Sequence, residues 1–215
     1  MSEQHDGHEP HPGIEADTGL SHYARRAKAI EGLLVAKGIC TTEEVQRRVD
    51  QMEARSPSDG AKVVARAWVD PDYKARLLAD PATALSELGY DLPDTTPQLA
   101  VVENTETVHH LVVCTLCSCY PSMLLGLPPD WYKSLAYRSR AVVDPRGVMG
   151  EFGLVLGPEV EVRVLDSTAD LRYLVLPARP HGTGGMSEGQ LAALVSRDSM
   201  IGVTLPRSPE AVSAA

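Results

Sequence analysis

"TVHHLVVCTLCSCYP", residues 107–121, places three of the chain's four cysteines within six positions at the end of an apolar run. The valine and leucine residues that precede Cys114 are typical of a β-strand. The three cysteines, Cys114, Cys117 and Cys119, then follow at spacings of three and two residues. We therefore expect a strand that ends in a cysteine-bearing loop.

A mixed domain is expected around this strand. Its further strands are expected at "QLAVVEN" (98–104), "EVEVRVLDS" (159–167) and "ADLRYLVLP" (169–177), and its helices at 144–153 and 187–202. The last two strand patterns alternate in polarity and are expected to pair with each other in antiparallel fashion. The sequence thus predicts an α+β domain over residues 93–215, layered in the order α-β-β-α.

The part of the chain before this domain has a different character. Residues 1–19 are polar and without periodicity, and we expect them to form a mobile tail. Residues 20–92 predict a helical arm, in which Thr41 and Glu44 form a capping box. Two Asp-Pro steps within the arm suit a helix N-cap followed by proline. The predicted fold class is therefore α+β, a helical arm followed by the layered domain.

Composition excludes several classes of partner. The chain has 215 residues, with 20 Lys and Arg against 29 Asp and Glu, and no basic run, which argues against nucleic acid or an anionic membrane as partner. No apolar stretch is long enough to span a bilayer and the N-terminus lacks a secretory pattern, so a cytoplasmic location is expected. In that reducing compartment, clustered cysteines indicate metal binding or catalysis.

Two common uses of clustered cysteines fit this spacing poorly. Cys114 and Cys117 have the Cys-x-x-Cys spacing of a redox dithiol, but this leaves Cys119 unexplained. Four-sulfur zinc and iron–sulfur sites usually take ligands from two separate loops. The remaining cysteine, Cys40, lies in the distant helical arm, where we interpret it as a small core residue.

Covalent geometry favours a third use, a metal claw. If the thiolates of Cys117 and Cys119 bind one ion together with the deprotonated amide nitrogens of Ser118 and Cys119, edge-sharing chelate rings form a flat square of two sulfurs and two nitrogens. Cys114 can add an axial sulfur, which leaves a sixth position open for a substrate. Such donors suit trivalent cobalt or iron better than zinc. Exposed metal thiolates are also prone to oxidise to sulfenic and sulfinic acids.

The segment "VCTLCSCYP" resembles the metal-binding segment of the nitrile hydratase α-subunit family, which includes the cobalt subunit of thiocyanate hydrolase. "GLPPDWYKSLAYRSRAVVDPRGVMGEFG", "DSTADLRYLVLPARP" and "QLAALVSRDSMIGV" are similar to the segments that follow it in such subunits. The resemblance covers residues 20–205. It implies an enzyme that hydrates a nitrile to an amide.

The resemblance also implies a role for each residue of the claw. Cys114 would be the axial thiolate, Cys117 a sulfinate and Cys119 a sulfenate, while Ser118 and Cys119 would give amide nitrogens. Thr115 occupies the position where the family associates Thr with cobalt, so Co(III) is expected rather than Fe(III). The metal would polarise the nitrile, and the Cys119 sulfenate would attack carbon itself or activate a water that does.

Partner chains are a further implication of the resemblance. The oxidised sulfurs carry negative charge and need hydrogen-bond donors. In the family, arginines of a separate β-type subunit supply them, so β-type partner subunits are expected here. A cobalt-delivery or activator protein is an additional expected partner.

One position departs from the family pattern. Many members have Trp after "CYP", where this chain has Ser122, followed by Met123. A small residue there predicts a wider pocket that accepts a bulky heteroaromatic nitrile, such as the nucleoside toyocamycin. The alternative is that Ser122 merely accompanies changes in other pocket walls, because the shape of a pocket depends on several walls. Two alternatives stay open: hydrolysis of thiocyanate by the same claw, and a non-catalytic thiol module that stores metal or relays electrons.

Other polar residues near the claw have structural interpretations beside functional ones. His109 and His110 lie on the expected strand and face opposite sides of it, and structural hydrogen bonds are the expected role of both. Arg138 and Arg140 are expected to hold the partner chain or the claw loop, or to form surface ion pairs. Asp144 is expected to cap a helix before Pro145.

Overall fold

The structure is a computed structural model that describes residues 22–93 and 96–210. The predicted mobile tail, residues 1–19, lies outside the described residues. The chain divides into two compact units, of which the first ends at Asp50 and the second begins at Gln51. The division into 1–19, 20–92 and 93–215 stays a prediction.

The first unit contains α1 (His22–Ala36) and most of α2 (Thr42–Glu53). The helices of the second unit are α3 (Pro57–Val69), α4 (Pro71–Ala79), α5 (Pro81–Ser86), α6 (Ser122–Leu125), α7 (Asp130–Lys133), α8 (Leu135–Val143), α9 (Pro145–Glu151), α10 (Glu188–Ala192) and α11 (Arg197–Ile201). Its strands are β1 (Gln98–Glu103), β2 (Val108–Val113), β3 (Glu161–Asp166) and β4 (Leu171–Leu176). Within the described residues, no helix has both the length and the apolar composition needed to cross a membrane.

Helices begin where the capping signals of the sequence predict. The box between Thr41 and Glu44 is confirmed, because the Glu44 N–H donates to Thr41 Oγ1 at 3.1 Å and the Thr41 N–H to Glu44 Oε2 at 2.8 Å. Asp70 and Asp80 each end one helix and cap the next, directly before a proline. Asp144 caps α9 in the same way, as expected. Local chemistry thus sets these joints.

The single helix predicted over residues 187–202 is wrong, because the segment forms two short helices, α10 and α11. Ser196 starts the second one: its side chain accepts from the Ser199 N–H at 3.1 Å, while the Ser199 hydroxyl accepts from the Ser196 N–H. A serine cap inside an apolar pattern therefore restarts the helix.

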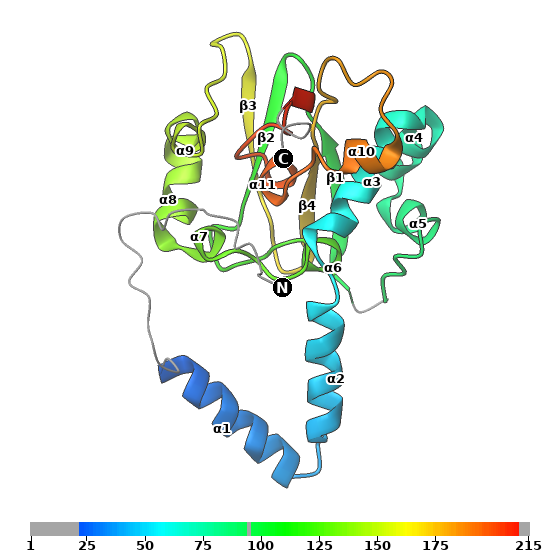
Figure 1. Cartoon of the computed structure of the whole chain (residues 1–215). Coiled ribbons are helices and arrows are strands. Elements are labelled where there is room, and N and C mark those ends of the chain that lie inside the picture. Colours follow the sequence, from blue (N-terminus) through cyan, green and yellow to red (C-terminus); the bar gives the residue numbers. More distant parts are fainter. Residues whose placement is uncertain (1–21, 94–95, 211–215) are drawn as a thin grey trace. The chain divides into compact units, whose positions relative to one another are not determined.

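Two parallel strand pairs form the centre of the second unit (Figure 1). β1 pairs with β4, and β2 pairs with β3. The expected antiparallel pairing of 159–167 with 169–177 is wrong, because β3 and β4, although consecutive, belong to different pairs. Alternating polarity indicates which side of a strand is buried, but the direction of its neighbour depends on the path of the whole chain. The register places Asp166 beside Val113, where β2 enters the cysteine loop.

Helices flank both strand pairs, and the predicted α+β class is confirmed. α4 and α5 neighbour β1, while α8 neighbours β2 and α9 neighbours β3 (Figure 1). α11 contacts both β2 and β4 and so joins the two pairs. Fully buried side chains such as Leu111 of β2 and Leu174 of β4 belong to one continuous apolar core. The strand that carries the cysteines is therefore embedded in the centre of the unit.

Buried hydrogen bonds fix β2 in place. Asn104 Nδ2 donates to His109 Nδ1 at 3.1 Å, and Asn104 Oδ1 accepts from the His110 N–H at 2.8 Å and from His110 Nδ1 at 3.1 Å. His109 Nε2 donates to Gly202 O at 2.7 Å. Burial lowers the pKa of both histidines, so the neutral rings are favoured. Both are structural residues, as expected.

We expect Gly202→Ala to lower the free energy of unfolding by at least about 1–2 kcal/mol, the cost of a left-handed conformation for a residue with a Cβ. Gly202 has a φ of 90°, and an added Cβ would also collide with the carbonyl oxygen of His110. Urea denaturation of the full chain measures the change. Gly184→Ala is the control, because a Cβ there meets nothing within 4 Å. Equal stability of both variants would contradict the prediction.

Candidate metal centre

The cysteine loop begins where β2 ends. β2 stops at Val113, and residues 114–121 continue without regular secondary structure until α6 begins at Ser122. Cys114 and Cys119 are buried, with 1% and 6% of their surface exposed, whereas Cys117 is exposed. The loop therefore turns two sulfurs toward the interior and one toward the outside.

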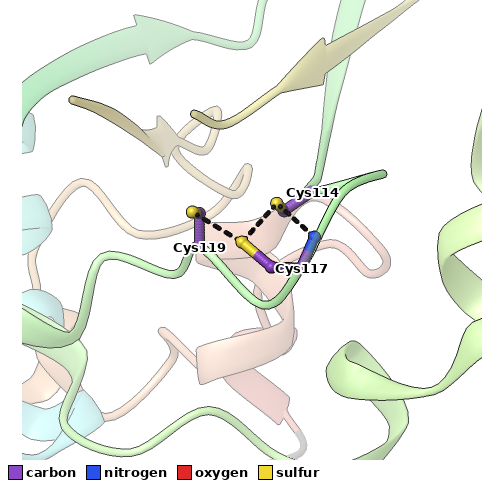
Figure 2. A group of neighbouring side chains, drawn as sticks. All are labelled: Cys114, Cys117 and Cys119. Atoms are coloured by element: carbon purple, nitrogen blue, oxygen red, sulfur yellow. Dashed lines mark hydrogen bonds between the residues drawn. The ribbon is translucent and has the colours of Figure 1, made fainter. Parts of the chain in front are cut away.

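Figure 2 shows the three side chains turned toward one another from this single loop. The Cys117 sulfur lies 3.4 Å from that of Cys114 and 3.1 Å from that of Cys119, and all three sulfurs lie within 4.8 Å of one another. Two thiolates bound to one ion at about 2.3 Å each lie at most about 4.6 Å apart, and both distances from the Cys117 sulfur fall below that limit. The sulfurs are thus spaced to hold one metal ion, as the sequence predicts.

The loop also directs amide groups at the sulfurs. The Cys117 N–H donates to Cys114 Sγ at 3.2 Å. The pKa of the Cys117 thiol is lowered by hydrogen bonds from the Cys119 and Cys114 thiols, and the backbone N–H groups of Cys119 and Ser118 lower it further. These last two amides are the predicted nitrogen ligands. Their role as ligands stays a prediction.

Cys119 is the thiol that keeps its proton. Burial, together with its hydrogen bond to Cys117, raises the pKa of Cys119 to about 12, while the Arg172 guanidinium acts in the opposite direction. Of the two hydrogen-bonded thiols, Cys117 and Cys119, the Cys117 thiol therefore loses its proton first. Arg172, an arginine of this same chain, thus acts on the pKa of the Cys119 thiol.

Asp166 holds the start of the loop. Its carboxylate accepts from the Thr115 N–H at 2.9 Å and from the Thr115 hydroxyl at 2.5 Å. Asp166 is the last residue of β3, and the parallel register with β2 sets it beside Val113. Thr115, which the sequence connects with the choice of metal, is therefore tied to the neighbouring strand.

Arg138, on α8, holds the same segment from another side. Its Nε donates to Cys114 O at 3.1 Å, and its Nη2 donates to Thr115 O at 2.8 Å. Of the roles expected for the two arginines, Arg138 thus contacts the claw loop, whereas Arg140 pairs with Glu151 at 2.5 Å on the surface.

Tyr132, on α7, holds the other end of the loop. Its hydroxyl donates to Cys119 O at 2.7 Å, and its side chain is fully buried. The ring packs edge-on against Tyr120, with centroids 5.1 Å apart. Tyr137 adds a hydrogen bond of 2.6 Å from its hydroxyl to Val112 O, just before the loop. The residues before and after the cysteines are thus attached to α7 and α8.

The residues predicted to line a pocket follow the loop directly. Ser122 is the first residue of α6, and its N–H donates to Tyr120 O at 2.7 Å. Met123 packs against the main apolar core. Leu116, at the tip of the loop, is 86% exposed. The pocket role of Ser122 and Met123 stays a prediction.

Sequence reasoning missed three residues of the site. Asp166, Arg172 and the hydroxyl of Tyr132 contact or influence the loop, although they lie 13 to 53 residues from the nearest cysteine. A correct prediction of parallel pairing between β2 and β3 would have identified Asp166, because this pairing places the end of β3 beside the loop. Arg172 and Tyr132 have no comparable local signal.

Known proteins share this chain's sequence and fold over most of its length. Residues 21–204 match the family model for the nitrile hydratase alpha chain. The low-molecular weight cobalt-containing nitrile hydratase subunit alpha of Rhodococcus rhodochrous is 54% identical over 187 residues, which cover 86% of this chain and 90% of that protein. The thiocyanate hydrolase subunit gamma of Thiobacillus thioparus is 39% identical over 215 residues, 95% of this chain and 87% of that protein.

Among solved structures, a recombinant thiocyanate hydrolase with partially modified cobalt centres is similar, with a TM-score of 0.81 and 40% identity. The match covers 88% of this chain and 92% of that chain. The residues matched by the family model, 21–204, include the cysteine loop and the elements that hold it.

We expect iodoacetamide to alkylate Cys117 of the metal-free chain at least about tenfold faster than Cys114 or Cys119, because Cys117 combines exposure with a lowered pKa. Peptide mass spectrometry after timed quenching measures the three rates. The chain unfolded in guanidinium is the control, since its cysteines should react at similar rates. Similar rates in the folded chain would show that the loop does not hold this shape.

Proposed function

The chain belongs to the nitrile hydratase α-chain family, and we propose that it is the metal-bearing subunit of a cobalt nitrile hydratase, which hydrates a nitrile to the amide. The observation that carries the proposal is the convergence of Cys114, Cys117 and Cys119 from one loop. The Rhodococcus rhodochrous relative is described as cobalt-containing, which supports cobalt as the metal.

The claw would hold the ion, as Co(III), through the sulfurs of Cys114, Cys117 and Cys119 and the amide nitrogens of Ser118 and Cys119. The Ser118 and Cys119 amides, which help to lower the pKa of the Cys117 thiol, support this ligand set. When bound, cobalt supplies a Lewis acid that polarises the carbon–nitrogen triple bond.

The chain's own residues would then supply the nucleophile. In the proposed active form, Cys117 is a sulfinate and Cys119 a sulfenate, and the Cys119 oxygen attacks the nitrile carbon or takes a proton from an attacking water. The exposure of Cys117 supports its more extensive oxidation, because oxidants reach exposed thiolates first. The buried position of Cys119 supports arrest at the sulfenate.

A β-type partner subunit would complete the site. Leu116 is 86% exposed and lies next to the exposed Cys117, so the outer side of the loop offers an apolar side chain and a thiol that another chain can cover, which supports the proposed partner. Arg138 already uses Nε and Nη2 on loop carbonyls, so arginines from the partner would bind the oxidised sulfurs. A cobalt-delivery protein remains part of the proposal.

We expect the chain, assembled with its partner in cobalt-containing medium, to convert nitriles to amides and to carry two oxygens on Cys117 and one on Cys119. Cys117→Ser should lower kcat/KM by about a hundredfold or more, because it removes a ligand of the Lewis acid. Cys40→Ser is the control, since Cys40 lies outside the claw. Amide formation and peptide masses are the measurements.

Two results would contradict this proposal. Full activity of Cys117→Ser would remove the claw from the chemistry. A Cys114–Cys117 disulfide in the active protein would favour the alternative, a thiol module that relays electrons or stores metal.

The substrate of this proposed hydratase is a bulky heteroaromatic nitrile, such as the nucleoside toyocamycin. Ser122 supports this, because a small side chain follows the claw where many family members have Trp, and α6 fixes it there. Thiocyanate is the second candidate, on account of the 39% identity with the Thiobacillus thioparus subunit. A small anion gains nothing from a wider pocket, which favours the bulky nitrile.

We expect the assembled enzyme to prefer toyocamycin over acetonitrile, with benzonitrile between them and thiocyanate slowest. Ser122→Trp should reduce kcat/KM for the nucleoside by about tenfold or more and leave acetonitrile hydration nearly unchanged, because the indole fills the space of the larger group. Ser122→Ala serves as the control. The bulky-substrate proposal is wrong if acetonitrile is preferred, and thiocyanate hydrolysis above all nitrile rates would support the second candidate.

A further inference from the structure

We propose that Arg138 is a positioning residue, which holds the claw loop in its metal-binding shape before any ion arrives. This inference rests on the proposed function, because it assumes that the claw is a metal site. It assigns a task to a residue outside the ligand set. Arg138 acts through the backbone of the loop and touches none of the proposed ligand atoms.

The two contacts of Arg138 define a turn of the chain. In an extended strand, the carbonyls of successive residues point in opposite directions. Here Cys114 O and Thr115 O both accept from one guanidinium, at 3.1 Å and 2.8 Å, so the chain has left the strand conformation at this point. That turn brings the Cys117 N–H back to Cys114 Sγ at 3.2 Å. Arg138 therefore stabilises the bend that brings the sulfurs together.

α8 holds Arg138 firmly enough for this task. Ser134 caps the helix by accepting from the Tyr137 N–H at 3.1 Å, and the Arg138 N–H donates to Ser134 O at 3.1 Å. The neighbouring Tyr137 hydroxyl donates to Val112 O at 2.6 Å. Two adjacent residues in the first turn of α8 thus bind the end of β2, through Tyr137, and the beginning of the loop, through Arg138.

The physical consequence concerns the entropy of metal binding. Ordering a flexible segment costs conformational entropy for every residue whose backbone becomes fixed. A loop that is already ordered by side chains of the fold avoids that cost when the ion binds. Lysine cannot replace the arginine fully, because an ammonium is a point charge without the planar fork that serves two carbonyls at once.

The chain offers a matched control two residues away. Arg140 lies on the same helix and carries the same charge, but it pairs with Glu151 on the surface. Arg140→Ala therefore removes a positive charge from α8 without touching the claw. A difference between variants at Arg138 and Arg140 reports on the two loop contacts rather than on the net charge.

The first test uses the metal-free full chain. Cys114 is 1% exposed in the folded chain, so its alkylation reports opening of the loop. We expect Arg138→Ala to speed iodoacetamide modification of Cys114 by about tenfold or more and Arg138→Lys by less, because losing the two carbonyl contacts lets the loop open more often. Arg140→Ala should match the wild type. Circular dichroism and thermal melting confirm that each variant is folded, and if Arg138→Ala is not, Arg138→Lys decides the test.

The second test uses the assembled, cobalt-loaded enzyme. We expect Arg138→Lys to lose cobalt to a chelator about 10- to 100-fold faster than the wild type or Arg140→Ala. A weaker or shifted sulfur-to-cobalt charge-transfer band should accompany the loss. A role confined to global stability would change the melting temperature but not this band.

The outcomes separate this inference from the proposed function. If the wild type binds no cobalt, the proposed function fails, while faster alkylation of Cys114 would still support Arg138 as the residue that shapes the loop. If the wild type holds cobalt and the Arg138 variants match Arg140→Ala in cobalt loss and in alkylation, the positioning role is overturned and the proposed function stands.

Discussion

The structure of this site depends on one constraint. Three sulfurs must stay within 4.8 Å of one another in a loop that has no regular secondary structure. Such a loop has no ladder of its own to order it, so its backbone groups need partners elsewhere. Asp166, Arg138 and Tyr132 provide them, from a strand and two helices. Each of these residues belongs to an element that packs on the core, so the backbone of the loop, and with it the three sulfurs, is held in a fixed position.

The parallel pairing of β2 with β3 makes one of these attachments possible. In this register the end of β3 lies beside the end of β2, so the carboxylate of Asp166 meets the first residues of the loop. The buried network of Asn104, His109 and His110 fixes the same strand from the opposite end and joins it to Gly202. β2 is therefore held along its length, and the loop begins from a fixed point.

The sequence predicted those features that local chemistry determines. Asp-Pro steps and the Thr41 box set helix starts through contacts three residues apart, and the spacing of Cys114, Cys117 and Cys119 defines the claw in one short segment. Strand direction was predicted wrongly, because pairing partners lie far apart in sequence and alternation is the same for either direction. The contact of Asp166 with the loop depends on that direction and was missed for the same reason.

The burial of the claw is uneven, and this suggests how work divides between this chain and its proposed partner. Cys114 and Cys119 are turned into the fold, while Cys117 and Leu116 face outward. The positioning contacts act on backbone carbonyls and amides and on the Thr115 hydroxyl, and none of them is made to a sulfur. Arg138 donates to carbonyls of the loop and not to a sulfur. Under the proposed function, donors from another chain would therefore stabilise the negative charge on the oxidised sulfurs. Under the proposed function, Arg172, whose positive charge acts to lower the pKa of Cys119, would contribute to that task from this chain.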